Sequence, residues 1–128
     1  MSQLKRILHV EDVPSIQVIT RVALEKLGGF EVLTCASAQQ ALAQAEAFAP
    51  DLILLDVMLP QMGGIELLHA LGEHLDLARV PVVFLTGQAE LDDFAELQRH
   101  GLRAVIRKPF DPLQLASRLR EIWAAEHG

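Results

Sequence analysis

Four short, mainly apolar runs, each followed at once by a charged or hydroxyl-bearing residue, constrain the fold of this chain most strongly. The runs are Ile7–Val10, Leu52–Leu55, Val82–Leu85 and Ala104–Ile106. Runs of this length that are apolar on both faces are typical of buried strands in a parallel sheet. The carboxyl ends of parallel strands meet at one edge of the sheet, where α/β proteins bind their ligands. The chain is therefore expected to be an α/β protein with a site at this edge.

Helical patterns fill the segments between the runs, so strands and helices alternate along the whole chain. Strands are expected at about 6–10, 30–34, 51–55, 80–85 and 103–107. Helices are expected from Pro14–Ser15 to Gly28, from Ser37 to Phe48, from about Ile65, from Leu91 to His100, and from Pro112 onward. This alternation leaves no linker, so residues 1–128 are expected to form one domain without an output domain.

Apolar positions at helical spacing predict the buried side of two of these helices. They are Ile16, Ile19, Ala23 and Leu27 in the first helix, and Leu91, Phe94, Ala95 and Leu97 in the fourth.

The bulk composition excludes several classes of protein. Apolar residues make up 51% of the 128 residues, which argues against disorder, and the net charge of −6 argues against a nucleic-acid-binding module. No apolar run approaches the ~20 residues that span a bilayer, so a cytoplasmic location is the default expectation. Cys35 has no partner for an internal disulfide and is expected to be a small buried apolar residue. The five histidines show no ligand spacing and are expected to be ordinary residues with satisfied hydrogen bonds.

The residues after the runs predict a site for a divalent cation and a phosphoryl group. Glu11, Asp12 and Asp56 bring three carboxylates to the sheet edge, while Thr86 adds a hydroxyl and Lys108 an ammonium. Two unit charges ~4 Å apart repel by about 4 kcal/mol at an effective dielectric constant near 20. Positive charge must offset this repulsion. Lys108 supplies one charge, and a hydrated Mg²⁺ held by oxygen ligands could supply two more.

The chain resembles the receiver domain of bacterial two-component response regulators over nearly its whole length, from about Leu4 to Ala125. Four pieces in a fixed order carry the resemblance: Glu11-Asp12, the loop from Asp56 to Gly64, Thr86-Gly87, and Lys108-Pro109-Phe110. The resemblance implies a flavodoxin-like, doubly wound, five-stranded parallel sheet of order 2-1-3-4-5 with five helices.

The resemblance also implies a role for each site residue. Asp56 would be the phosphoacceptor, with Thr86 and Lys108 contacting the phosphoryl oxygens. Mg²⁺ would be held by Asp12, Asp56 and the backbone carbonyl of Met58, with Glu11 acting through water. The peptide bond before Pro109 would be cis and would aim the lysine side chain inward.

Two positions depart from the family pattern. Val105 stands where many members have an aromatic residue that swings inward on activation, and the chain contains no tyrosine. Phosphorylation is therefore expected to move Thr86, with output on the face made by the fourth helix, fifth strand and fifth helix depending on backbone and helix shifts. Gly63 stands where the family often has a side-chain helix cap, and this loss is expected to be small.

The resulting hypothesis is a phosphorylation-activated switch that is not an enzyme in the ordinary sense but assists its own phosphorylation and dephosphorylation. Its phosphoryl donor would be a histidine kinase or a phosphotransfer protein. Its output would be altered binding to a downstream protein, as a monomer or a phosphorylation-dependent dimer, with no nucleic acid or membrane involved.

Three alternatives remain open at this point. The chain could be a receiver taken from a larger regulator or hybrid kinase. It could be a phosphoaspartate phosphatase or mutase, although such enzymes usually carry a second aspartate where this chain has Met58. A flavodoxin-type cofactor carrier would need a hydroxyl- and glycine-rich loop after the first strand, where the sequence reads Glu11-Asp12-Val13-Pro14.

Overall fold

The computed structural model describes residues 3–57, 59, 62–87 and 94–127. A parallel sheet of order β2-β1-β3-β4-β5 runs through its centre. The strands are β1 (Arg6–Val10), β2 (Glu31–Cys35), β3 (Leu52–Asp56), β4 (Val82–Thr86) and β5 (Leu102–Arg107). The helices are α1 (Pro14–Val22), η1 (Ala23–Leu27), α2 (Ala38–Phe48), α3 (Gly64–Leu71), α4 (Phe94–Arg99) and α5 (Pro112–His127). The predicted flavodoxin-like fold and strand order are confirmed.

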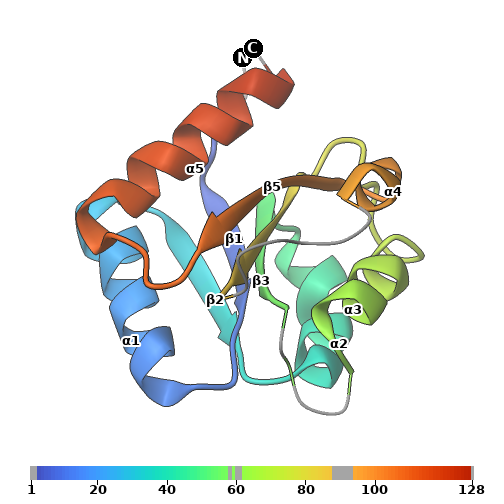
Figure 1. The fold of residues 1–128 in the computed structure, drawn as a ribbon, viewed down its shortest axis with the longest axis horizontal. Coiled ribbons are helices and arrows are strands. Elements are labelled where there is room, and N and C mark those ends of the chain that lie inside the picture. Colours follow the sequence, from blue (N-terminus) through green and yellow to red (C-terminus); the bar gives the residue numbers. More distant parts are fainter. Residues whose placement is uncertain (1–2, 58, 60–61, 88–93, 128) are drawn as a thin grey trace.

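Helices cover both faces of the sheet and enclose two separate apolar cores. Figure 1 shows α1 and α5 on one side of the sheet, and α2, α3 and α4 on the other. Side chains alternate between faces along each strand. Ile7, Leu54 and Leu85 therefore join the core beneath α1 and α5, whereas Leu8, Leu55 and Phe84 join the core beneath α2, α3 and α4. We call these the α1/α5 core and the α2/α3/α4 core.

The strands end one residue later than the sequence predicts at two places that matter for the site. β3 extends to Asp56 and β4 extends to Thr86, so both residues are held by the sheet rather than by a loop. Asp56 pairs in register with Leu85, and Thr86 pairs with Arg107. The backbone of both residues is therefore fixed by the most buried part of the molecule.

Side-chain caps begin two of the helices. Ser37 Oγ accepts a hydrogen bond from the Gln40 N–H at 3.2 Å at the start of α2. Asp111 Oδ1 accepts one from the Leu113 N–H at 2.9 Å at the start of α5. Gly63 precedes α3 without a side-chain cap, as predicted. These caps satisfy N–H groups that have no partner within the helix.

The predicted apolar stripe of the first helix is wrong in part. Ile19 and Leu27 are exposed, while Thr20 and Leu24 are fully buried. The helix turns into the π-helical segment η1, where the Gly28 N–H donates to the Ala23 carbonyl five residues earlier, at 3.1 Å. This wider turn changes the direction of the side chains that follow it, which accounts for the exposure of Leu27. Before the turn, the buried side of α1 is offset by one residue from the prediction, because Thr20 rather than Ile19 faces the core.

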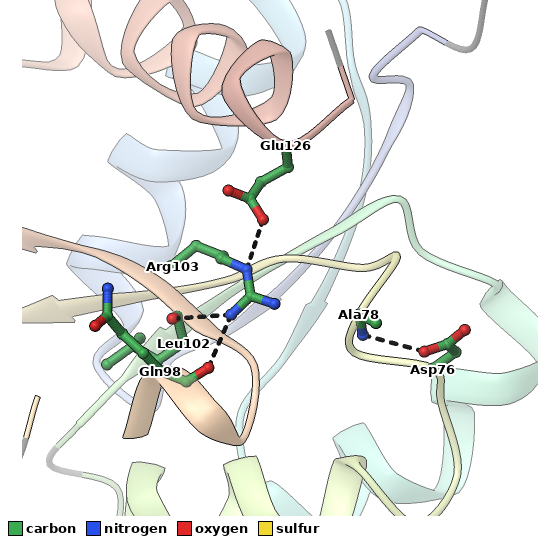
Figure 2. Close-up of polar contacts among 6 residues, drawn as sticks. All are labelled: Asp76, Ala78, Gln98, Leu102, Arg103 and Glu126. Carbon is green, nitrogen blue, oxygen red and sulfur yellow. Dashed lines mark hydrogen bonds and ion pairs between the residues drawn. The ribbon is translucent and has the colours of Figure 1, made fainter. Parts of the chain in front are cut away.

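The end of α4 is tied to both β5 and α5 by Arg103 (Figure 2). Its Nε donates to Glu126 of α5 at 2.6 Å, and its Nη1 donates to the carbonyls of Gln98 in α4 and Leu102 in β5. Of the predicted apolar side of this helix, Leu97 is buried but Ala95 is exposed, which corrects that position. Leu91 lies outside the described residues.

Candidate functional site

The fold brings the predicted charged residues together at the carboxyl edge of the sheet. Glu11 and Asp12 directly follow β1, Asp56 ends β3, and Lys108 directly follows β5. One oxygen of each of the three carboxylates lies within 4.8 Å of the others. β1, β3, β4 and β5 are adjacent and parallel, so their ends converge even though the residues are far apart in the sequence.

Lys108 joins the two buried carboxylates of the site. Its Nζ lies 3.0 Å from Glu11 Oε1 and 3.3 Å from Asp56 Oδ2. The side chain of Glu11 is 0% exposed, that of Asp56 is 5% exposed and that of Lys108 is 19% exposed. The backbone N–H of Lys108 donates to the Thr86 carbonyl at 2.7 Å, and the peptide bond to Pro109 is cis, as the family resemblance implies.

The surroundings of Glu11 favour its protonated form, because negative charge outweighs positive charge in the pocket. Burial raises the pKa of its carboxyl group, and the neighbouring Asp56 raises it further, while Lys108 acts in the opposite direction. Three carboxylates around a single ammonium carry excess negative charge, which burial makes more costly. An added cation would relieve this repulsion.

The donor set fits a small hard cation such as Mg²⁺. All three ligand candidates offer carboxylate oxygens, the ligands that Mg²⁺ prefers, and Asp12 is the most exposed of them. Within the described residues no other group of three potential ligands lies as close together. The carbonyl of Met58, also assigned to the metal by the resemblance, lies outside the described residues.

Thr86 lies at the same edge but belongs to the other face of the sheet. It follows Phe84 by two residues, so alternation places it on the side of the α2/α3/α4 core, and it is buried. Val105, which pairs in register with Phe84, packs against the same core. Val105, the position where the resemblance implies an aromatic switch residue, is therefore on the same face as Thr86.

Gly64 allows α3 to begin directly against the strand that carries Asp56. A Cβ on Gly64 would lie 2.8 Å from the Asp56 carbonyl oxygen and 2.8 Å from Val57 Cα. Both are backbone atoms that cannot move without disturbing the end of β3. The glycine therefore permits the close approach that fixes one wall of the site.

Gly64→Ala is expected to destabilise the protein by about 1–3 kcal/mol because this clash has to be relieved by a backbone shift. Chemical denaturation measures the effect. Gly63→Ala is the matched control, because among the described residues a Cβ there would meet only the Val57 carbonyl oxygen, at 3.8 Å. Equal stabilities for the two variants would contradict the role assigned to Gly64.

Sequence reasoning missed one residue that lies close to this site. His9, expected to have satisfied hydrogen bonds, is fully buried, and neither ring nitrogen has a partner in the described part of the chain. Burial lowers its pKa to about 4, and Lys108 lowers it as well, while Asp56 opposes them. The sequence does carry a sign of this burial, because His9 stands within the otherwise apolar run Ile7–Val10. Cys35, by contrast, is buried as predicted.

Comparison with known proteins identifies the family to which this arrangement belongs. Residues 7–120 match the model of the response regulator receiver domain. The chain belongs to this family. Receiver domains are the signalling switches of two-component systems, and Glu11, Asp12, Asp56, Thr86 and Lys108 all lie within the matched residues. The interpretation of the sequence as a receiver domain is confirmed.

Both sequence relatives and solved structures support this membership. The chain is 39% identical over 118 residues to the phosphate regulon transcriptional regulatory protein PhoB of Pseudomonas aeruginosa, covering 92% of this chain and 51% of that protein. It is 36% identical to the alkaline phosphatase synthesis transcriptional regulatory protein PhoP of Bacillus subtilis, covering 92% and 48%. The receiver chain thus spans about half the length of these relatives.

Solved receiver domains superpose over nearly the whole chain. A CheY-like response regulator receiver domain protein from Methanospirillum hungatei matches with a TM-score of 0.85 and 33% identity, covering 98% of both chains. The chemotaxis protein CheY4 of Vibrio cholerae matches with a TM-score of 0.84 and 29% identity, covering 93% of this chain and 98% of that one. No helix among the described residues is long and apolar enough to cross a bilayer.

Proposed function

We propose that this receiver domain accepts a phosphoryl group on Asp56 from a histidine kinase or phosphotransfer protein and relays the signal by altered protein binding. The observation that carries the proposal is the contact of Lys108 Nζ with both Asp56 and Glu11 beside the three-carboxylate cluster. A buried carboxylate beside fixed positive charge, at the open edge of a sheet, is suited to attack phosphorus.

In the proposed reaction, Asp56 uses a carboxylate oxygen to form a bond to phosphorus while the bond from phosphorus to the donor atom breaks. The ammonium of Lys108, 3.3 Å from Asp56 Oδ2, lies where it can pair with a phosphoryl oxygen. The hydroxyl of Thr86 would donate a hydrogen bond to another phosphoryl oxygen. A Cβ on Gly87 would meet no atom of the described residues within 4 Å, which leaves room beside the end of β4 for the incoming group.

Asp12 and Asp56 would hold Mg²⁺ directly, with Glu11 contributing through water. The bound ion would neutralise charge on the transferring oxygens. The Glu11 carboxyl, whose pKa is raised in the metal-free pocket, would then ionise more readily. The carbonyl of Met58 completes the proposed ligand set.

The proposed output surface is the face formed by α4, β5 and α5. Thr86 lies on the sheet face that α4 covers, and Arg103 links α4, β5 and α5 through Gln98, Leu102 and Glu126. A shift of Thr86 toward the phosphoryl group would therefore be transmitted to these elements. Val105 cannot supply a ring movement, so backbone and helix shifts would carry the change.

Incubation with a small phosphoryl donor and Mg²⁺, followed by intact-protein mass spectrometry, tests the phosphoacceptor. Wild type is expected to gain one phosphoryl group, and Asp56→Asn is expected to gain none. Asp76→Asn is the matched control, because Asp76 is exposed and accepts only a local bond from the Ala78 N–H at 3.1 Å. Equal phosphorylation of Asp56→Asn and wild type, or none in wild type, would refute the proposal.

A further inference from the structure

A set of side chains with buried polar atoms lies on the α1 side of the sheet, outside the group proposed to handle phosphate. It consists of His9 in β1, Thr34 in β2 and Thr20 in α1. Both ring nitrogens of His9 and the hydroxyl oxygens of the two threonines are buried and have no hydrogen-bond partner among the described residues. Buried polar atoms in folded proteins are almost always paired, so this group of three requires an explanation.

The register of the sheet places these side chains in one layer. His9 pairs directly with Thr34, and paired residues of adjacent parallel strands point to the same face. Ile7 and Val32, two residues earlier on each strand, pack in the α1/α5 core, so His9 and Thr34 also face that side. Thr20 is the buried residue of α1, and α1 packs against β2, the strand that carries Thr34.

Leaving these atoms unpartnered would be costly. One buried, unsatisfied polar group weakens folding by roughly one to two orders of magnitude in the equilibrium constant. The chemistry of the group suits a small partner that both donates and accepts. A neutral imidazole offers one donor and one acceptor, and each threonine hydroxyl offers both. The lowered pKa of His9 is consistent with the neutral ring at physiological pH.

We propose that His9, Thr20 and Thr34 form an internal hydration site that holds about one or two ordered water molecules between the sheet and α1. The site adjoins the phosphoryl pocket, because Leu54 is the register partner of His9 and Asp56 follows two residues later on the same face. It requires neither Mg²⁺ nor a phosphoryl group. Its existence therefore does not depend on the proposed function, and each can fail without the other.

Water–protein cross-relaxation in NMR spectra of the wild-type protein tests the site directly. Long-lived water signals are expected at the His9 ring and at the methyl groups of Thr20 and Thr34. The signal at the Thr20 methyl group is expected to disappear in the double variant His9→Leu, Thr34→Val, which retains that group. Absence of long-lived water at these groups in wild type would overturn the proposal, and this measurement requires no variant to fold.

A double-mutant cycle distinguishes bridging water from independent side chains. Thr34→Val is expected to raise the unfolding equilibrium constant about tenfold in wild type and less than about threefold in the His9→Leu background. His69→Leu, at an exposed histidine of α3, is the matched control and should leave the effect of Thr34→Val unchanged. Additive effects would overturn the proposal. Coupling without long-lived water would also overturn it, since the side chains would then bond to one another directly.

Discussion

Asp12→Asn is expected to weaken Mg²⁺ binding at least tenfold and, at the same time, to stabilise the metal-free protein by about 1–3 kcal/mol. The two effects have one cause. The carboxylates of Glu11, Asp12 and Asp56 lie within 4.8 Å of one another, with Lys108 as the neighbouring ammonium. Removing one negative charge relieves repulsion in the empty pocket and removes a ligand from the cation.

Calorimetric titration with Mg²⁺ and urea denaturation in the presence of a chelator measure the two effects separately. Asp76→Asn is a suitable control, because it removes the same charge from an exposed loop outside the pocket. The control should change neither the Mg²⁺ affinity nor the contribution of the pocket to stability. Unchanged Mg²⁺ affinity in Asp12→Asn would count against the metal site, and a loss of stability would count against the repulsion between the carboxylates.

His9 is expected to make the protein sensitive to mild acid. Its pKa is lowered from the ordinary value of 6.5 to about 4 in the folded state. As the pH falls below about 6.5, the unfolded chain binds the proton before the folded protein does, so stability is lost. The loss continues down to about pH 4 and amounts to about 3 kcal/mol, of which roughly 2 kcal/mol is lost by pH 5.

Urea denaturation of wild type and His9→Leu between pH 7 and pH 5 tests this prediction. The difference in free energy of unfolding between the two proteins should change by about 2 kcal/mol over that range, with wild type losing stability as the pH falls. Glu11 acts with the opposite sign, because its raised pKa lets the folded protein take up a proton first. Its effect is present in both proteins and largely cancels in the difference. Parallel pH profiles would show that His9 keeps an ordinary pKa.

The fold and the charged site could be predicted because each depends on a local pattern with a clear physical meaning. A buried strand followed by a charge places that charge at the carboxyl edge of a parallel sheet, whatever the length of the intervening helix. Asp56 and Lys108 therefore meet although a full set of strand and helix units separates them. The caps at Ser37 and Asp111 were predictable for the same reason, since each bonds within its own segment.

The features that could not be predicted depend on contacts between segments. The π-helical turn at Ala23–Leu27 changes which residues of the first helix are buried, and regular spacing gives no sign of it. Burial of His9 follows from its position on the sheet face that the α1/α5 core covers, which no single strand pattern reveals. Ala95 is exposed although it falls on the predicted apolar side, because the short described helix α4 buries only Leu97 fully.

Asp56 and Thr86 lie on opposite faces of one sheet. The side chains around the proposed phosphoacceptor and those around the residue proposed to respond to it can therefore change separately during evolution. The α1/α5 core lies on the face of Asp56, which would receive the phosphoryl group. The α2/α3/α4 core lies on the face of Thr86, which would respond to it. Substitutions in the two cores would therefore affect different residues of the site. The sheet keeps these two sets of side chains out of contact except at its carboxyl edge. Under the proposed function, a lineage could therefore change the surface that reads the signal while leaving the carboxylate that would carry the phosphoryl group intact.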